Sequence, residues 1–123
     1  MQSITIKNAA LVDCLFDVVR QPSGTQSAIL LYTPTGSVYR TEAAKIEISA
    51  KTVNGKTAPV VTVAVPYGVT SDGVFKKLGQ VNHVVSATQP ADSPTTARLD
   101  AEAFARNILA NVQVQALFKN GTI

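Results

Sequence analysis

The sequence predicts an α+β domain in which an antiparallel sheet is followed by helices. In the segments 44–53, 56–66 and 79–88 apolar residues alternate with polar residues. This alternation is typical of strands that bury one face and expose the other to solvent. From residue 93 onward the apolar residues recur at helical spacing. Strands first and helices last are typical of a segregated α+β fold, and we expect the 123 residues, 1–123, to form a single domain.

The first residues predict an N-terminal β-hairpin over 1–20. Its strands are expected at 3–7, which alternates between apolar and polar residues, and at 11–20. Pro22 and Gly24 stand two positions apart immediately afterwards, and this composition indicates a turn.

The main sheet is predicted over 26–89. Its first strand, 27–33, is almost continuously apolar. The polar stretch that follows, as far as Thr41, includes Tyr39 and Arg40 and is expected to be a loop or an irregular start of the next strand.

The strands at 44–53 and 56–66 are predicted to form a tight hairpin. Asn54 and Gly55 lie between them, and both residue types tolerate the positive φ that a two-residue hairpin turn requires. Pro66 is expected to end the second strand, which leaves 67–77 as a long loop. Loops of this length between antiparallel strands are usually functional or conformationally adaptable.

Two C-terminal helices are predicted over 93–120. Ser93 is a suitable N-cap, with Pro94 at the first helical position, and Gly121 suits the end of the second helix, 112–119. The predicted apolar stripe consists of Ala101, Phe104, Ala105, Ile108, Leu109 and Val112, continued by Val114, Leu117 and Phe118.

Composition bounds the kind of protein. Eleven basic and eight acidic residues give a net charge of +3, a mild bias towards an anionic partner that an ordinary surface explains equally well. The single cysteine, Cys14, excludes an intramolecular disulfide and lies in an apolar run, so we expect a buried thiol. No secretory signal is recognisable, and no stretch has the ~18 apolar residues of a membrane helix, so no membrane partner is expected.

The residue types needed for catalysis are not grouped. His83 is the one histidine and lies on the apolar side of its strand, so we expect it to be packed. Gly55-Lys56-Thr57 is similar to the end of a phosphate-binding loop, but position 50 is Ala50 where that loop needs glycine. One histidine and one cysteine cannot build a metal cluster. We therefore predict no enzyme, no cofactor, no metal and no small-molecule substrate.

One chain does not supply enough helix to cover the predicted sheet. Five strands of about seven residues present a face of roughly 550 Å², whereas a helix of about 17 residues covers only about 250 Å². Either the N-terminal hairpin folds over the remainder, or a second copy contributes its helices in an obligate dimer.

The other face of the sheet is free for a partner. Short hydrogen-bonding groups mixed with lysines suit contacts to phosphates and limited reading of bases, although an ordinary solvated face would have the same pattern. Aromatic residues for base stacking are missing there. The predicted polar side carries Lys45, Glu47, Ser49, Lys51, Thr62, Asn82, Ser86 and Thr88.

The order of these elements resembles the coat protein of levivirus-type single-stranded RNA bacteriophages. The most specific local match runs from Val63-Ala64-Val65-Pro66, through a long glycine-containing loop, to a strand that ends at Gln89-Pro90 before the terminal helices. The resemblance implies an intertwined homodimer with a ten-stranded sheet, in which each chain's helices clasp its partner. It further implies an icosahedral shell, a virion assembled in the bacterial host cytoplasm, and single-stranded genomic RNA on the inner sheet face.

The resemblance also implies roles for particular residues. Certain family members bind an RNA stem-loop and thereby repress translation. Glu47 and Val60 stand where such members have hydroxyl side chains. Asn82 stands where such members can have an aromatic residue that stacks on a base. The implied RNA-facing positions are Lys45, Glu47, Ser49, Lys51, Val60, Thr62, Asn82, Val84 and Ser86. The implied dimer interface is Phe104, Ile108, Leu109, Leu117 and Phe118, and the implied inter-dimer loop includes Tyr67, Gly68, Ser71, Asp72 and Gly73. The alternative is a free-standing dimeric nucleic-acid-binding regulatory module that forms no shell.

Overall fold

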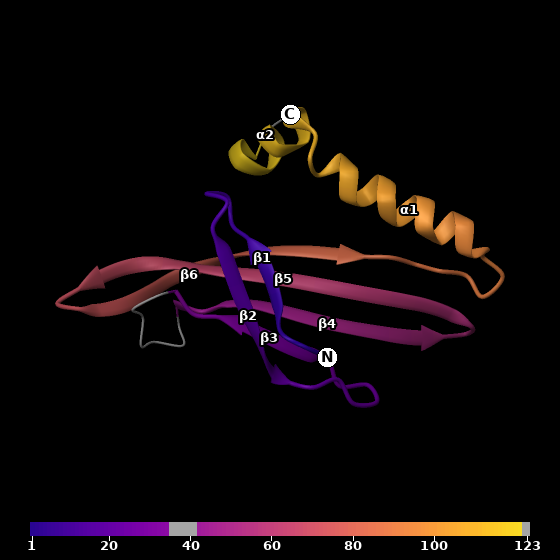
Figure 1. Ribbon diagram of the computed structural model, residues 1–123, viewed down its shortest axis with the longest axis horizontal. Coiled ribbons are helices and arrows are strands. Elements are labelled where there is room, and N and C mark those ends of the chain that lie inside the picture. The colour runs from indigo at the N-terminus through magenta and orange to yellow at the C-terminus, as the bar shows by residue number, and fades with distance from the viewer. Residues whose placement is uncertain (35–41, 122–123) are drawn as a thin grey trace. The chain divides into compact units, whose positions relative to one another are not determined.

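The computed structural model describes residues 1–34 and 42–121, so the loop expected around Tyr39 and Arg40 lies outside it (Figure 1). The chain divides into two compact units, Met1–Thr88 and Gln89–Ile123. The first unit contains all the strands and the second both helices.

The first unit is one antiparallel sheet in which each strand pairs with the next along the chain. The α+β class and the antiparallel sheet are confirmed. The strands are β1 (Ile4–Lys7), β2 (Asp13–Arg20), β3 (Ala28–Tyr32), β4 (Ala44–Val53), β5 (Lys56–Ser71) and β6 (Val74–Ser86).

The hairpin turn between β4 and β5 forms as predicted. Asn54 has φ 51° and Gly55 has φ 76°, so both central residues of the turn adopt the left-handed conformation for which this residue pair is suited. The register that follows sets Glu47 opposite Thr62 and Lys51 opposite Ala58.

The long loop predicted at 67–77 is wrong. β5 continues past Pro66, and a second tight turn at Asp72 and Gly73, with φ 51° and 76°, returns the chain into β6. The pairing of the two strands includes a register shift beside Gly68, where a Cβ would overlap the carbonyl oxygen of Lys76. Glycine is therefore what allows the backbones to approach at this irregularity.

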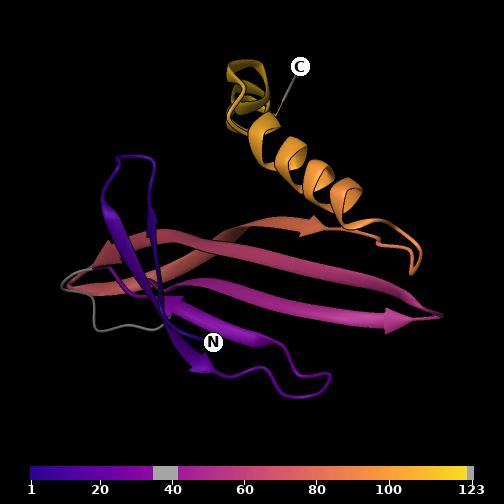
Figure 2. The same ribbon diagram turned by 45° about the vertical axis from the view of Figure 1, so that its right-hand side comes forward.

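The core lies where the N-terminal hairpin curls over the sheet. Cys14 and Phe16 of β2 are buried against Leu30 of β3 and Ile46 of β4, and the ring of Phe16 lies 5.7 Å from that of Tyr32. Figures 1 and 2 show the β1–β2 hairpin crossing the long strands steeply. The prediction of a buried Cys14 is confirmed. The hairpin itself covers part of the apolar face, as one of the two sequence-based options proposed.

The second unit consists of α1 (Thr95–Ile108) and α2 (Val112–Asn120). The N-cap of α1 is Pro94 and not Ser93, whose hydroxyl instead donates to the carbonyl of Pro90 at 2.6 Å. At α2 the Asn111 side chain accepts the backbone N–H of Gln113, and Gly121 closes the helix with φ 74°, as predicted. Within the described part of the chain, neither helix is long and apolar enough to cross a membrane.

Candidate nucleic-acid interface and self-association surfaces

The register gathers the predicted RNA-facing residues on one face of β4, β5 and β6, here called the polar face. One row runs from Glu47 through Thr62 to Val84, and a second runs from Ser49 through Val60 to Ser86. The strand ends at Ser86, so the prediction that it continues to Thr88 is wrong. The remaining predicted members of the polar face are Lys45, Lys51 and Asn82, and all nine predicted positions lie on it.

A hydrogen-bonded network joins Glu47 to β2 and β3. Arg20 donates through Nη2 to Ser27 Oγ at 2.5 Å, and Ser27 Oγ donates to Glu47 Oε1 at 2.6 Å. Lys45 Nζ lies 3.7 Å from Glu47 Oε2, and Arg20 Nη2 lies 3.8 Å from Glu47 Oε1. One carboxylate is thus held by a hydroxyl and two cations.

This environment keeps Glu47 ionised. The hydrogen bond from Ser27 holds the pKa of the Glu47 carboxyl below its ordinary value, against a smaller opposing effect of burial, and the charges of Lys45 and Arg20 lower it further. The carboxylate is already compensated by its neighbours, so it contributes little free negative charge to the face.

The polar face is more basic than sequence alternation alone indicated. Lys56 and Lys77 join Lys45 and Lys51 on it, since Lys56 pairs with Val53 and Lys77 pairs with Gly68. Glu47 is the one carboxylate that the described parts of β4, β5 and β6 place on this face. The face therefore has the charge that favours a polyanion.

Four polar residues of this surface were not predicted from the sequence. Arg20 reaches the polar face because a register shift follows Val18, and alternation alone would have set it on the core side. Lys77 was expected in the loop 67–77, and Lys56 was expected at the start of its strand without a place on the polar side. The Asp72-Gly73 pair was the signal that would have extended the strands and placed Lys77. The residues missed are Arg20, Ser27, Lys56 and Lys77.

The opposite face of the sheet exposes aliphatic side chains beyond the part that the hairpin covers. Val65 of β5 and Val81 and Val85 of β6 are each about half exposed, at 49%, 54% and 51%. His83 lies on this face opposite Val63, as predicted, but its side chain is exposed and the expectation of a buried histidine is wrong. Within the described sheet β6 pairs only with β5, so its other edge is an open strand edge.

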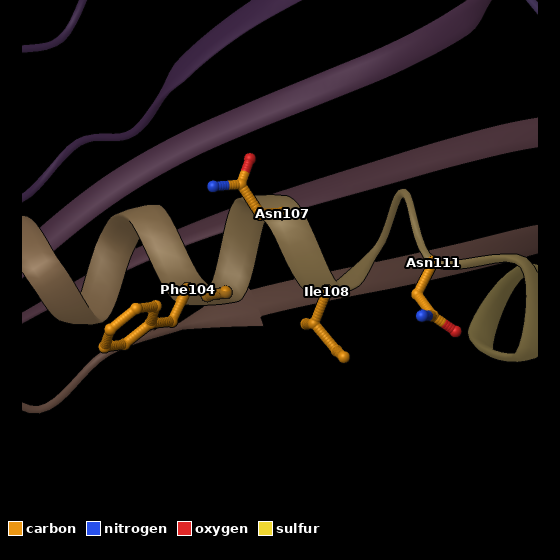
Figure 3. Close-up of a pocket in the computed structure, with 5 residues that line it drawn as sticks. Phe104, Asn107, Ile108 and Asn111 are labelled. Carbon is orange, nitrogen blue, oxygen red and sulfur yellow. The ribbon is translucent and has the colours of Figure 1, made fainter.

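The helical unit also exposes the apolar residues that were predicted to form an interface. Phe104 is 73% exposed and Ile108 53%, and with Asn111 they line a hollow of about 580 Å³. Asn107 also lines the hollow, but Figure 3 shows its side chain on the other side of the helix from Phe104, Ile108 and Asn111. Further exposed members are Leu109 at 44% and Phe118 at 55%, whereas Leu117 is half-buried.

The predicted inter-dimer residues lie along the outer part of the β5–β6 hairpin. Tyr67 and Gly68 stand at the register shift, and Ser71, Asp72 and Gly73 form the end and the turn. Tyr67 is 55% exposed. The hairpin tip therefore carries these residues at one end of the sheet.

Comparison with known proteins identifies the fold. No protein-family model and no curated protein matches the sequence. Among solved structures, a virus-like particle of Beihai levi-like virus 21 matches with a TM-score of 0.85 and 15% identity, covering 100% of this chain and 96% of that one. A virus-like particle of bacteriophage NT-214 matches with a TM-score of 0.81 and 16% identity, covering 98% and 93%.

A third match is the capsid protein of bacteriophage GA, with a TM-score of 0.70, 15% identity and coverage of 99% of this chain and 95% of that one. The matched structures are phage coat proteins and virus-like particles. The chain has, over nearly its whole length, the fold of the coat proteins of levi-like RNA bacteriophages.

Proposed function

We propose that this protein is a structural capsid protein that assembles as dimers into an icosahedral shell around single-stranded RNA. The observation that carries the proposal is the match, over 98% to 100% of the chain, to proteins whose structures are those of virus-like particles. The location that follows is the virion, with assembly in the cytoplasm of a bacterial host.

The dimer is supported by apolar surface that one chain leaves exposed on both of its units. Phe104 and Ile108 on α1 and Val81 and Val85 on β6 would be costly to leave in water, since burial contributes roughly 25 cal/mol for each Å² of apolar area. In the proposed dimer each chain's helices cover its partner's sheet. The open edges of the two β6 strands pair, so that β2 to β6 of both chains form a ten-stranded sheet.

RNA binding is supported by the polar face. Lys45, Lys51, Lys56 and Lys77 project from the side opposite Val65, Val81 and Val85. If the partner's helices cover the apolar side, the polar face is the side left to line the interior. Lysines beside short hydroxyl and amide groups suit the phosphates and sugars of a flexible single strand.

We further propose that the polar face recognises a specific RNA stem-loop and thereby represses translation. Glu47 stands at the centre of the polar face, and its carboxylate cannot donate a hydrogen bond to a base or phosphate. Ser49, Thr62 and Asn82 retain donors and acceptors nearby. A gel shift with RNA hairpins, selected from a random-loop pool, tests this role separately from shell formation.

Contacts between dimers are proposed to involve the β5–β6 hairpin tip. Its turn at Asp72 and Gly73 is exposed, and Val69 and Val74 beside the turn are 50% and 52% exposed. Exposed aliphatic side chains at the end of a long two-stranded hairpin suit an assembly contact.

The decisive experiment is electron microscopy and size-exclusion chromatography of the purified chain, with its RNA content measured from the 260/280 nm absorbance ratio. Megadalton particles with a nucleic-acid spectrum are the expected result. Dimers that bind RNA but never form particles would favour the free-standing regulatory module instead. A stable monomer without RNA would rule out both.

A further inference from the structure

We infer that a hollow on the polar face, beside the Glu47 network and sharing Lys45 with it, is a subsite for one nucleotide of single-stranded RNA. Its floor and walls come from β3, β4, β5 and β6, and its volume is about 180 Å³. Pockets for drug-sized ligands start at about 300 Å³, so this hollow suits a single base and not a larger ligand. The lining residues that matter are Leu31, Lys45, Ala64, Pro66, Lys77 and Gln80.

The floor of the hollow is apolar. Ala64 is 4% exposed, and Pro66 and Leu31 are half-buried beside it. Small side chains and a proline ring leave a flat surface on which the face of a base can lie, without the aromatic platform that most single-strand-binding proteins use.

The rim is cationic at two points. Lys45 lies on β4 opposite Ala64, and Lys77 lies on β6 beyond the register shift. The sheet spacing of about 4.8 Å between neighbouring strands separates β4 from β6 by roughly 10 Å. Two ammonium groups on either side of an apolar floor suit a base whose flanking phosphates reach both of them.

Gln80 is held where it can read the edge of a base. Its Oε1 accepts from Lys77 Nζ at 2.8 Å, and its Nε2 donates to Asn82 Oδ1 at 3.0 Å. An amide has two donor hydrogens and two acceptor lone pairs, so one of each remains for a ligand. A glutamine fixed in this way can make paired hydrogen bonds to one base edge.

The Glu47 network explains why the nucleotide is assigned to this hollow and not to the centre of the face. Ser27 and Arg20 are engaged with the carboxylate of Glu47, and an ionised carboxylate has no hydrogen to donate to a phosphate placed there. Lys77 has no carboxylate within ion-pair distance among the residues that the structure describes. Its charge is thus available to RNA.

The inference rests on the proposed RNA-binding function, and the test separates the two. Binding of fluorescent 12-nucleotide oligo(A), oligo(C) and oligo(U) to the full-length unassembled chain is measured by anisotropy at several salt concentrations. Lys77→Gln is expected to weaken binding about fivefold and to lower the salt slope by about 0.7. Lys76→Gln, on the neighbouring residue and the opposite face, is the matched control and should leave both values unchanged.

Two further variants test the hollow itself without changing charge. Gln80→Leu removes the reading amide and should reduce differences between the three oligonucleotides, and Ala64→Val raises the floor and should weaken binding about threefold or more. If Lys77→Gln weakens binding but neither of these variants does, the site is a phosphate contact only and the inference is wrong. If none differs from Lys76→Gln while the wild type still forms RNA-filled particles, the inference fails and the proposed function stands. If the wild-type protein binds no RNA, both the inferred subsite and the proposed RNA-binding function are wrong.

Discussion

Ser27 on the approach to β3 donates a hydrogen bond of 2.6 Å to Glu47 on β4, and Arg20 reinforces it from β2. The polar side of the sheet is therefore tied together across three strands by one compensated carboxylate. The network stabilises the sheet across these strands.

Removing the hydroxyl should destabilise the protein in a pH-dependent way. Ser27→Ala is expected to cost about 1 kcal/mol at pH 7, less than the roughly 1.5–3 kcal/mol of a buried bond to a charged group, because the Glu47 side chain is 37% exposed. Since the folded-state pKa of Glu47 is lowered, its stabilising contribution is present above its ordinary value of 4.5 and is lost as the pH falls through the lowered value.

The difference in stability between Ser27→Ala and the wild type should therefore shrink as the pH falls below 4.5 and through the lowered pKa of the Glu47 carboxyl, where the carboxyl takes up its proton. Urea unfolding at fixed protein concentration measures it, with Ser49→Ala on the same face as the control. A difference that stays constant over this range would show that Ser27 does not act through the Glu47 charge.

The helix surface yields a prediction about assembly. Phe104→Asp should abolish dimers and particles, because burying an unpaired carboxylate in an apolar interface costs several kcal/mol. Asn107→Asp introduces the same charge on the same helix, where the side chain points to the other side in Figure 3, and should be tolerated. Size exclusion measures both, and circular dichroism confirms that the helices remain. Dimers of normal size in Phe104→Asp would exclude this surface from the interface.

The lysines of the polar face should govern RNA content and not assembly. Lys45→Glu combined with Lys51→Glu should leave dimers intact and lower the 260/280 nm ratio of purified material. The salt slope of RNA binding should fall by about 0.7 for each phosphate that is no longer neutralised by a lysine. The matched double change, Lys76→Glu with Lys119→Glu, alters net charge equally, but Lys76 lies on the opposite face of the sheet and Lys119 on α2. Equal RNA loss in the two doubles would mean that net charge alone retains RNA.

Features of the fold that depend on residues close in the sequence could be predicted, whereas features that depend on the pairing of separate strands could not. The alternation from Lys45 to Lys51 predicted which face each side chain takes, because strand period is a property of the sequence itself. Arg20 could not be placed, since the register shift after Val18 depends on how β2 pairs with β3. The Asp72-Gly73 turn was predictable in principle, but Pro66 was interpreted as a strand end, whereas here it pairs opposite Gln80 within the hairpin.

The RNA-facing and interface residues were proposed from the resemblance and from face alternation together. Alternation brought Glu47, Thr62 and Val84 into one row, which the register confirms. It could not show that Ser27 and Arg20 occupy the Glu47 carboxylate, because the Ser27–Glu47 bond joins residues 20 apart in the chain and the Arg20–Glu47 pair spans a longer separation still. What each row binds stays a prediction.

The outer β5–β6 hairpin should depend on two glycines for different reasons. Gly73→Ala meets no atom within 4 Å, so its cost is only the positive φ of 76°, about 1 kcal/mol. Gly68→Ala places a Cβ on top of the Lys76 carbonyl oxygen, so the pairing of Gly68 with Lys77 must shift, at about 1–3 kcal/mol.

Amide hydrogen exchange separates the two glycine variants. Gly68→Ala should reduce protection from Val69 to Lys76 while the β4–β5 pairs stay protected, and Gly73→Ala should reduce it only beside the turn. Gly24→Ala is the matched control, because Gly24 has φ 58° and no atom within 4 Å but lies in another turn. Because the hairpin tip is proposed to join dimers, Gly68→Ala should also lower particle yield at unchanged dimer content. Normal particles with an unprotected hairpin would exclude the tip from the contacts between dimers.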